Sequence, residues 1–277
     1  MATRSILSRI KMLVERRIPI AAHLYRTVRD EIHCQRIKSV NTPDGFSFAG
    51  DEAMQIGSFE PEETQIIKQQ LEDADILIDI GANTGLYTCL ARSMEKHVIA
   101  IEPHPQNLRI LYRNLEENGW KDVEVWPIGL AEESGIITLY GGNTGASVVK
   151  GWAEIPDSWK QRIPVHSLDL ILGSRFTDKR IIIKMDVEGA EYNVLLGARN
   201  TLQRVIRPVW LVEITLTLNH PEMNRKFLPT FEMFWQNGYE VRTGDAVKKL
   251  VTRSDVERWV KNGECDIGTY NWLFVPL

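Results

Sequence analysis

Short apolar runs alternate with amphipathic stretches through the middle of the chain. The spacing predicts strands at 76–80, 97–102 and 122–126, with helices at 85–95 and 105–118 between them. Such alternation is typical of a parallel sheet that helices cover on both faces, so we predict an α/β fold with a doubly wound sheet. After a break the alternation resumes with strands at 180–185, 208–214, 239–243 and 270–275 and helices at 189–203 and 227–237.

The first 60 residues follow a different pattern. Apolar residues at helical spacing among lysines and arginines predict a basic amphipathic helix over 5–17, and a second helix is predicted over 21–37. A turn and a short hairpin follow, and Pro61 with two glutamates after it marks the start of a helix that leads into the first strand. We therefore divide the chain into a basic helical extension with a hairpin, 1–60, and a main domain, 61–277.

Charge is distributed unevenly along the chain. The net charge is −4, but residues 1–40 contain nine basic and three acidic side chains and carry +6, which leaves −10 on the rest. An acidic main domain disfavours a nucleic-acid partner, because a phosphate backbone requires a basic groove. Two interpretations of residues 1–17 stay open: peripheral contact with an anionic membrane surface, or packing on the main domain or on a second subunit of a homo-oligomer.

The sequence shows neither a membrane span nor a secretory signal. No apolar run approaches the roughly 20 residues that a spanning helix needs, and arginines interrupt the first 20 residues. We therefore expect a cytoplasmic protein, with association at a membrane surface as the open alternative.

The most informative segment is Asp79-Ile80-Gly81-Ala82-Asn83-Thr84-Gly85, which follows an apolar strand and opens a helix. Its glycines allow the backbone to approach a ligand closely, and the helix offers free N–H groups at its start. Glu102 ends the next strand, at the distance of about 20 residues where dinucleotide-binding folds place a ribose-binding acid. The glycine pattern lacks the tight turn made for a pyrophosphate, so a nucleoside without phosphates fits better. S-adenosylmethionine (SAM) is the common ligand of that kind.

These residues define a predicted cofactor site. We expect the ribose of SAM to meet Glu102 and its amino acid end to lie over the glycine turn, where Asp79 takes the ammonium directly or through water. His104 is expected to cap or border the adenosine site. The candidate cofactor-binding residues are Asp79, Gly81, Asn83, Gly85, Glu102, His104 and Asp186.

A second group of acids follows the strands at 181–185 and 208–214. Asp186 and Glu188 should face the same crevice as the glycine turn, since ligands bind beyond the carboxyl ends of parallel strands. Lys184 lies inside the apolar strand and needs a carboxylate partner. We expect Glu213 and His220 to help ionise a substrate hydroxyl or to complete a metal site. The candidate catalytic residues are Lys184, Asp186, Glu188, Glu213 and His220, and those for a Mg²⁺ ion are Asp186, Glu188 and Glu213.

Four segments together resemble the FkbM-type methyltransferases. They are the glycine segment 79–85, Ile101-Glu102-Pro103, Ser167-Leu168-Asp169, and Lys184-Met185-Asp186-Val187-Glu188-Gly189-Ala190-Glu191. The resemblance covers about Asp75 to Glu213 and leaves residues 1–60 outside. It implies the class I methyltransferase (Rossmann-like) sheet of seven strands with an antiparallel last strand, and SAM-dependent methylation of hydroxyls on sugars and natural products.

The predicted function is therefore O-methyl transfer from SAM. The expected acceptor is a hydroxyl of a sugar, of a glycan or glycolipid, or of a secondary metabolite. Two alternatives stay open: a nicotinamide-dependent oxidoreductase on the same class of sheet, and a non-catalytic nucleoside-binding module.

Overall fold

The computed structural model describes residues 28, 31, 32, 34, 36–142 and 145–277 of the chain. The predicted amphipathic helix at 5–17 and most of the predicted helix at 21–37 lie outside these residues. Among the helices within them, none has both the length and the apolar character needed to cross a membrane.

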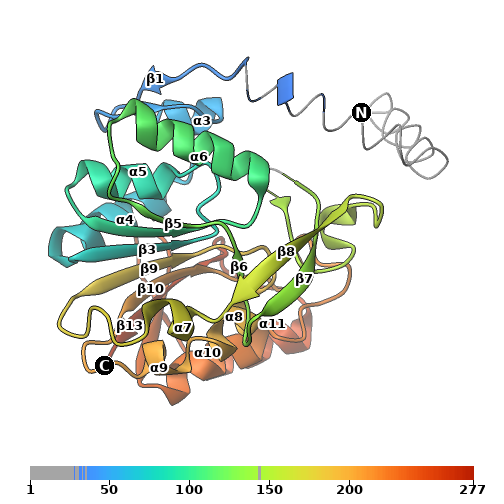
Figure 1. Ribbon diagram of the computed structural model, residues 1–277. Coiled ribbons are helices and arrows are strands. Elements are labelled where there is room, and N and C mark those ends of the chain that lie inside the picture. Colours follow the sequence, from blue (N-terminus) through green and yellow to red (C-terminus); the bar gives the residue numbers. More distant parts are fainter. Residues whose placement is uncertain (1–27, 29–30, 33, 35, 143–144) are drawn as a thin grey trace.

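An eight-stranded sheet forms the centre of the molecule (Figure 1). Five neighbouring strands run parallel, and β13 runs antiparallel to both of its neighbours. The predicted doubly wound sheet with an antiparallel last strand is thus confirmed, and β12 adds a two-residue edge strand. In spatial order the strands are β12 (Leu250–Val251), β11 (Tyr239–Thr243), β13 (Asn271–Pro276), β10 (Val209–Glu213), β9 (Ile181–Met185), β3 (Ile76–Ile80), β4 (His97–Ile101) and β5 (Glu124–Trp126).

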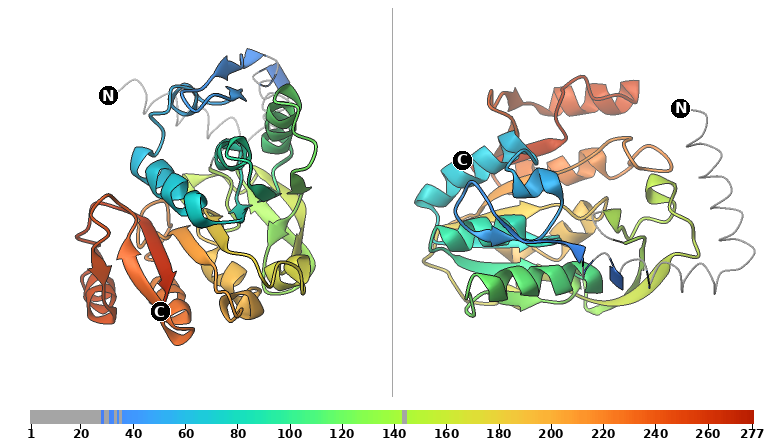
Figure 2. Two further views of the ribbon diagram at one scale, coloured as in Figure 1. Left: turned by 90° about the vertical axis from the view of Figure 1, so that its left-hand side faces the viewer. Right: turned by 90° about the horizontal axis from the view of Figure 1, so that it is seen from above.

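Each face of the sheet packs against its own layer of helices (Figures 1 and 2). In β3, Ile78 and Ile80 point into one core and Leu77 into the other, as the twofold repeat of a strand requires. The Leu77 side is covered by α4 (Pro61–Asp73), α5 (Leu86–Ser93) and α6 (Pro105–Glu117). The Ile78 side is covered by α7 (Leu168–Leu172), α8 (Glu191–Leu196), α9 (Arg199–Leu202), α10 (Phe227–Gln236) and α11 (Arg253–Asn262).

The prediction of one helix over 189–203 is wrong. The segment begins its helix only at Glu191 and divides into α8 and α9. Gly197 separates the two, and a Cβ atom there would lie 2.2 Å from the carbonyl oxygen of Ala131. This close backbone contact bends the chain where the sequence pattern alone predicts continuity.

A second, three-stranded sheet lies beside the carboxyl ends of the central strands (Figure 1). Its order is β6 (Gly129–Leu130), β8 (Lys160–His166) and β7 (Gly135–Tyr140). The sequence pattern indicates a strand and a glycine-rich loop over 135–149 but no strand at the position of β8, with which β7 pairs in antiparallel register over its whole length.

The N-terminal part of the described chain packs on the α4–α6 layer. The predicted hairpin is present as β1 (Val40–Asn41) and β2 (Ser47–Phe48), and α3 (Glu52–Gln55) follows it. Phe46, Phe48 and Met54 are buried in the same core as Leu77. The domain boundary at residue 60 stays a prediction.

The end of β3 approaches the end of β9 closely. Gly81 adopts a φ of +79°, and a Cβ atom there would lie 1.8 Å from the carbonyl oxygen of Asp186. Backbone hydrogen bonds hold both strands in place, since Gly81 donates to Ile101 and Asp186 donates to Ile80. Only glycine fits at position 81 without moving a strand.

We predict that Gly81→Ala destabilises the protein far more than Gly119→Ala. Gly119 has a similar φ of +71° but open space around its missing Cβ, so the alanine there should cost about 1–2 kcal/mol of conformational strain. At position 81 the overlap with Asp186 adds to that strain, and we expect a total above about 4 kcal/mol or failure to fold. Urea unfolding of both variants tests this, and equal losses would contradict the steric argument.

Candidate active site

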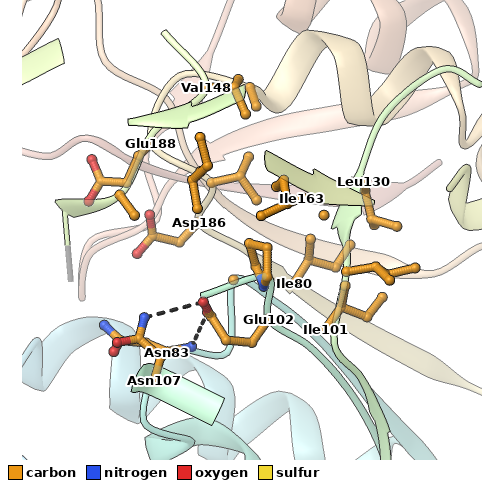
Figure 3. A pocket seen from close by; sticks show the side chains of 18 of the residues that line it. Ile80, Asn83, Ile101, Glu102, Asn107, Leu130, Val148, Ile163, Asp186 and Glu188 are labelled. Carbon is orange, nitrogen blue, oxygen red and sulfur yellow. Dashed lines mark hydrogen bonds between the residues drawn. The ribbon is translucent and has the colours of Figure 1, made fainter. Parts of the chain in front are cut away.

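A pocket opens between the carboxyl ends of β3, β4 and β9 and the small sheet (Figure 3). Polar residues at the strand ends form one side of it, and apolar side chains from the small sheet form the other. The position is the usual ligand crevice of a doubly wound sheet. Its lining includes Gly81, Asn83, Glu102, Asn107, Asp186 and Glu188 on the polar side, and Leu130, Ile137, Leu139 and Ile163 on the apolar side.

The buried Glu102 carboxylate organises the polar side. One oxygen accepts from the backbone N–H of His104 at 2.8 Å and from Asn107 Nδ2 at 3.2 Å, and the other accepts from the N–H of Asn83 at 2.8 Å. Figure 3 shows the bonds to Asn83 and Asn107. Burial raises the pKa of Glu102 to about 7, although these donors oppose the rise. The second oxygen accepts a single bond from the described residues, so it retains a lone pair for a ligand.

Asn83 offers a second free acceptor. Its side-chain Oδ1 is buried and has no hydrogen-bond partner among the described residues, and the residue lines the pocket. Buried polar atoms are normally paired, so this atom is suited to a donor on a bound molecule. Asn107, which helps to hold Glu102, was not identified from the sequence.

Three predicted cofactor residues are not part of the pocket lining: Asp79, Gly85 and His104. Asp79 is buried under α5 and accepts from Thr88 Oγ1 at 2.7 Å, and burial raises its pKa to about 6. His104 is buried at the start of α6, next to Glu102. Gly85, with a φ of +89°, is the residue before α5 and turns the chain into that helix. Their contacts with SAM stay predictions.

Lys184 forms a buried ion pair. Its Nζ lies 2.9 Å from Asp186 Oδ2, and its side chain is 4% exposed. Burial by itself lowers the pKa of this ammonium, but Asp186 and Glu60 more than compensate and raise it well above its usual value. The expected carboxylate partner of Lys184 is therefore Asp186.

Two further carboxylates, those of Glu60 and Glu213, lie close to this pair. Oxygens of Glu60, Asp186 and Glu213 all lie within 4.8 Å of one another, and Tyr87 donates its hydroxyl to Glu60 at 2.7 Å. Burial and the neighbouring Asp186 raise the pKa of Glu213 far above its ordinary value. Asp186 and Glu213 are predicted from the sequence, whereas Glu60 and Tyr87 are not. Both lie near the first residues of helices, α4 and α5, which is the only signal that could have indicated them.

Glu188 lies at the edge of the pocket close to Asp186 (Figure 3). It has a φ of +53°, which is unusual for a residue with a side chain, and the turn is closed by Glu191, which accepts from the N–H of Gly189 at 2.8 Å. Burial first and Asp186 second raise the pKa of Glu188.

His220 lies outside the pocket lining. Its ring contacts the indole of Trp152 edge to face, with centroids 4.5 Å apart, and burial lowers its pKa. The structure thus brings Lys184, Asp186, Glu188 and Glu213 together and places His220 behind them.

Comparison with known proteins identifies the family. The model of the methyltransferase FkbM domain matches residues 79–241, more than half of the chain. Hexuronic acid methyltransferase AglP of Haloferax volcanii is 29% identical over 141 residues, which cover 51% of this chain and 57% of that protein. Methyltransferase 1 of Beauveria bassiana is 26% identical over 148 residues, covering 45% of this chain and 59% of the relative. The chain thus spans less than three-fifths of the curated relatives that it matches.

Solved methyltransferase structures were found as well. The O-methyltransferase from Bacillus cereus in complex with SAH superimposes with a TM-score of 0.44 and 12% identity, over 96% of each chain. Precorrin-6y C5,15-methyltransferase from Geobacter metallireducens gives a TM-score of 0.39 and 15% identity, over 71% of this chain and 80% of that one. On the evidence of the family model, the chain belongs to the FkbM methyltransferase domain family.

Proposed function

We propose that this protein is a SAM-dependent O-methyltransferase that acts on a hydroxyl of a sugar, of a glycan or glycolipid, or of a secondary metabolite. The observation that carries the proposal is the polar side of the pocket, where a buried acid and an unpartnered amide oxygen face a cavity with an apolar opposite wall. The family supports methyl transfer, and the relative named for hexuronic acid supports a sugar acceptor.

The residues present fit SAM. Glu102 offers a lone pair to the ribose hydroxyls, and Gly81 lets the backbone of Asp186 approach the turn beside it. Asn83 Oδ1 can accept a hydrogen bond from the amino acid end of the cofactor. Apolar residues such as Ile128 and Leu130 suit an adenine ring.

Glu188 is our candidate base. When bound, SAM supplies a methyl group on a positively charged sulfur, which keeps the C–S electron pair as the methyl group bonds to the acceptor oxygen. The acceptor proton then passes to a carboxylate, and Glu188 lies at the pocket edge where it can receive that proton. Its raised pKa makes it a stronger base than an ordinary glutamate once it is ionised.

We favour a reaction without a metal ion. Among the described residues, the carboxylates that lie close enough to share a cation are Glu60, Asp186 and Glu213, and Glu188 is not one of them. Lys184 already places an ammonium against Asp186, and a Mg²⁺ ion would have to compete with that buried charge. We therefore assign Lys184 the role of resident cation in this cluster.

We predict that SAM binds and NAD does not, and that Glu102→Ala weakens SAM binding by about 1–3 kcal/mol, because a carboxylate that bonds ribose hydroxyls is lost. Calorimetric titration measures this. Glu116→Ala, which removes an exposed carboxylate from α6, is the control and should bind as the unaltered protein does. NAD binding would favour the oxidoreductase, and unchanged SAM affinity in a folded Glu102→Ala protein would remove the ribose assignment.

We predict that Glu188→Gln lowers kcat by roughly 10²-fold or more, the usual scale for loss of a general base. The assay follows release of S-adenosylhomocysteine with a panel of hexoses and hexuronic acids, and Glu133→Gln at an exposed site serves as control. Since the pKa of Glu188 is raised, the rate should increase with pH through a midpoint above the normal glutamate range.

The same assay separates the remaining alternatives. EDTA should leave turnover unchanged. If EDTA abolishes turnover while SAM still binds with the same affinity, the reaction depends on a metal ion. Full activity of both Asp186→Asn and Glu188→Gln would show that these acids act neither as the base nor as metal ligands. Tight SAM binding without turnover on any acceptor would favour the non-catalytic module.

A further inference from the structure

We propose that Trp152 is a positioning residue for Glu188: its ring holds the 188–189 turn in place, and its indole N–H is directed to the Glu188 carboxylate. The inference rests on the proposed function only for the part that Glu188 plays in the reaction. The contact between the two side chains can be tested without turnover.

The ring of Trp152 packs directly on the turn. Trp152 begins a short 3₁₀ turn, η2 (Trp152–Glu154), and is 2% exposed. A Cβ atom at Gly189 would lie 2.8 Å from the ring and 2.9 Å from Val149, so only glycine admits the indole here. Glu188 and Gly189 both have positive φ angles, of +53° and +94°. The conformation of Glu188 is unfavourable for a residue with a side chain and persists only where its surroundings hold it, and Trp152 is a large side chain that packs on this turn.

Two hydrogen bonds connect the segment around Trp152 to its neighbours. Ser147 donates its hydroxyl to the carbonyl oxygen of Glu188, and Ala153 donates its N–H to the carbonyl of Asn219 at 2.7 Å. His220 follows Asn219 and places its ring against Trp152. Residues 147–153 therefore link the Glu188 turn to the loop after β10, and His220 supports Trp152.

The indole nitrogen of Trp152 is the group that can bind the Glu188 carboxylate. It is buried and has no hydrogen-bond partner among the described residues, and the ring that carries it lies against Gly189, the residue after Glu188. Acting as a donor, Trp152 lowers the pKa of Glu188. An indole N–H can only donate, and the ionised carboxylate is the better acceptor. The other charged groups that act on Glu188 are Asp186, Glu191 and Lys184. Glu188 in turn acts on Glu213, together with Asp186 and Lys184.

A ring that merely fills space is the alternative explanation, and Trp152→Phe separates the two. Phenylalanine keeps an aromatic ring against Gly189 and His220 but removes the N–H. Trp210→Phe is a matched control, because Trp210 is equally buried, its indole nitrogen also lacks a partner among the described residues, and its ring packs against Phe234.

The experiment measures the titration of Glu188 directly. Protein labelled with ¹³C at glutamate carboxyl groups is followed by NMR over pH, and the Glu188 signal is assigned by its loss in Glu188→Gln. Trp152→Phe should raise the Glu188 midpoint by about one pH unit, because the ionised form loses a donor. Trp210→Phe should leave it unchanged. An unchanged midpoint in Trp152→Phe, or an equal shift in both variants, would overturn the proposal.

A second measurement on the unaltered protein covers the case in which Trp152→Phe does not fold. In protein labelled with ¹⁵N-tryptophan, one indole N–H signal should titrate with the Glu188 midpoint and should stop titrating in Glu188→Gln. If no indole signal follows that midpoint, Trp152 does not contact the carboxylate. Normal kcat in Glu188→Gln would refute Glu188 as the base but would leave these NMR results unaffected, so the two failures are distinguishable.

Discussion

The buried ammonium of Lys184 determines how the site is built. An unpaired charge inside an apolar strand would be too costly, so acids must surround it. In the sheet register Lys184 lies beside Asp79 of β3, on the face that α4 and α5 cover. Glu60 reaches it from the residue before α4, and Asp186 pairs with it from the end of its own strand. The charge network therefore joins two strands to the helix layer and fixes the carboxyl ends around the pocket.

In this network the carboxyl groups outnumber the single ammonium of Lys184. One ammonium offsets one carboxylate, and burial together with mutual repulsion raises the pKa values of Glu188 and Glu213. A cation bound nearby would lower both values and release protons. The electrostatics thus suit a positively charged ligand, and binding of such a ligand would shift Glu188 toward its ionised form.

The sequence predicted the elements whose periodicity is regular and missed those that depend on tertiary contacts. Both bounds of β11 match the prediction. The acids after β4 and β9 were found because the end of an apolar run can be located in the sequence. β8 was missed, since its pattern contains two apolar inward residues around Pro164. The position of Glu60 before a helix start does not reveal its contact with Lys184, and Trp152 carries no local signal, because both residues act on segments far away in the sequence.

The motifs that carry the family resemblance divide into two kinds. Glu102, Asp186 and Glu188 line the pocket, whereas others are structural: Ser167 caps α7, and Asp169 accepts backbone N–H groups from the start of α9. Both kinds contribute to the family match, so the match by itself measures the preserved fold as much as the preserved chemistry. For this reason cofactor binding and methyl transfer are separate questions, and in the proposed function the first concerns the Glu102 side of the pocket and the second concerns Glu188.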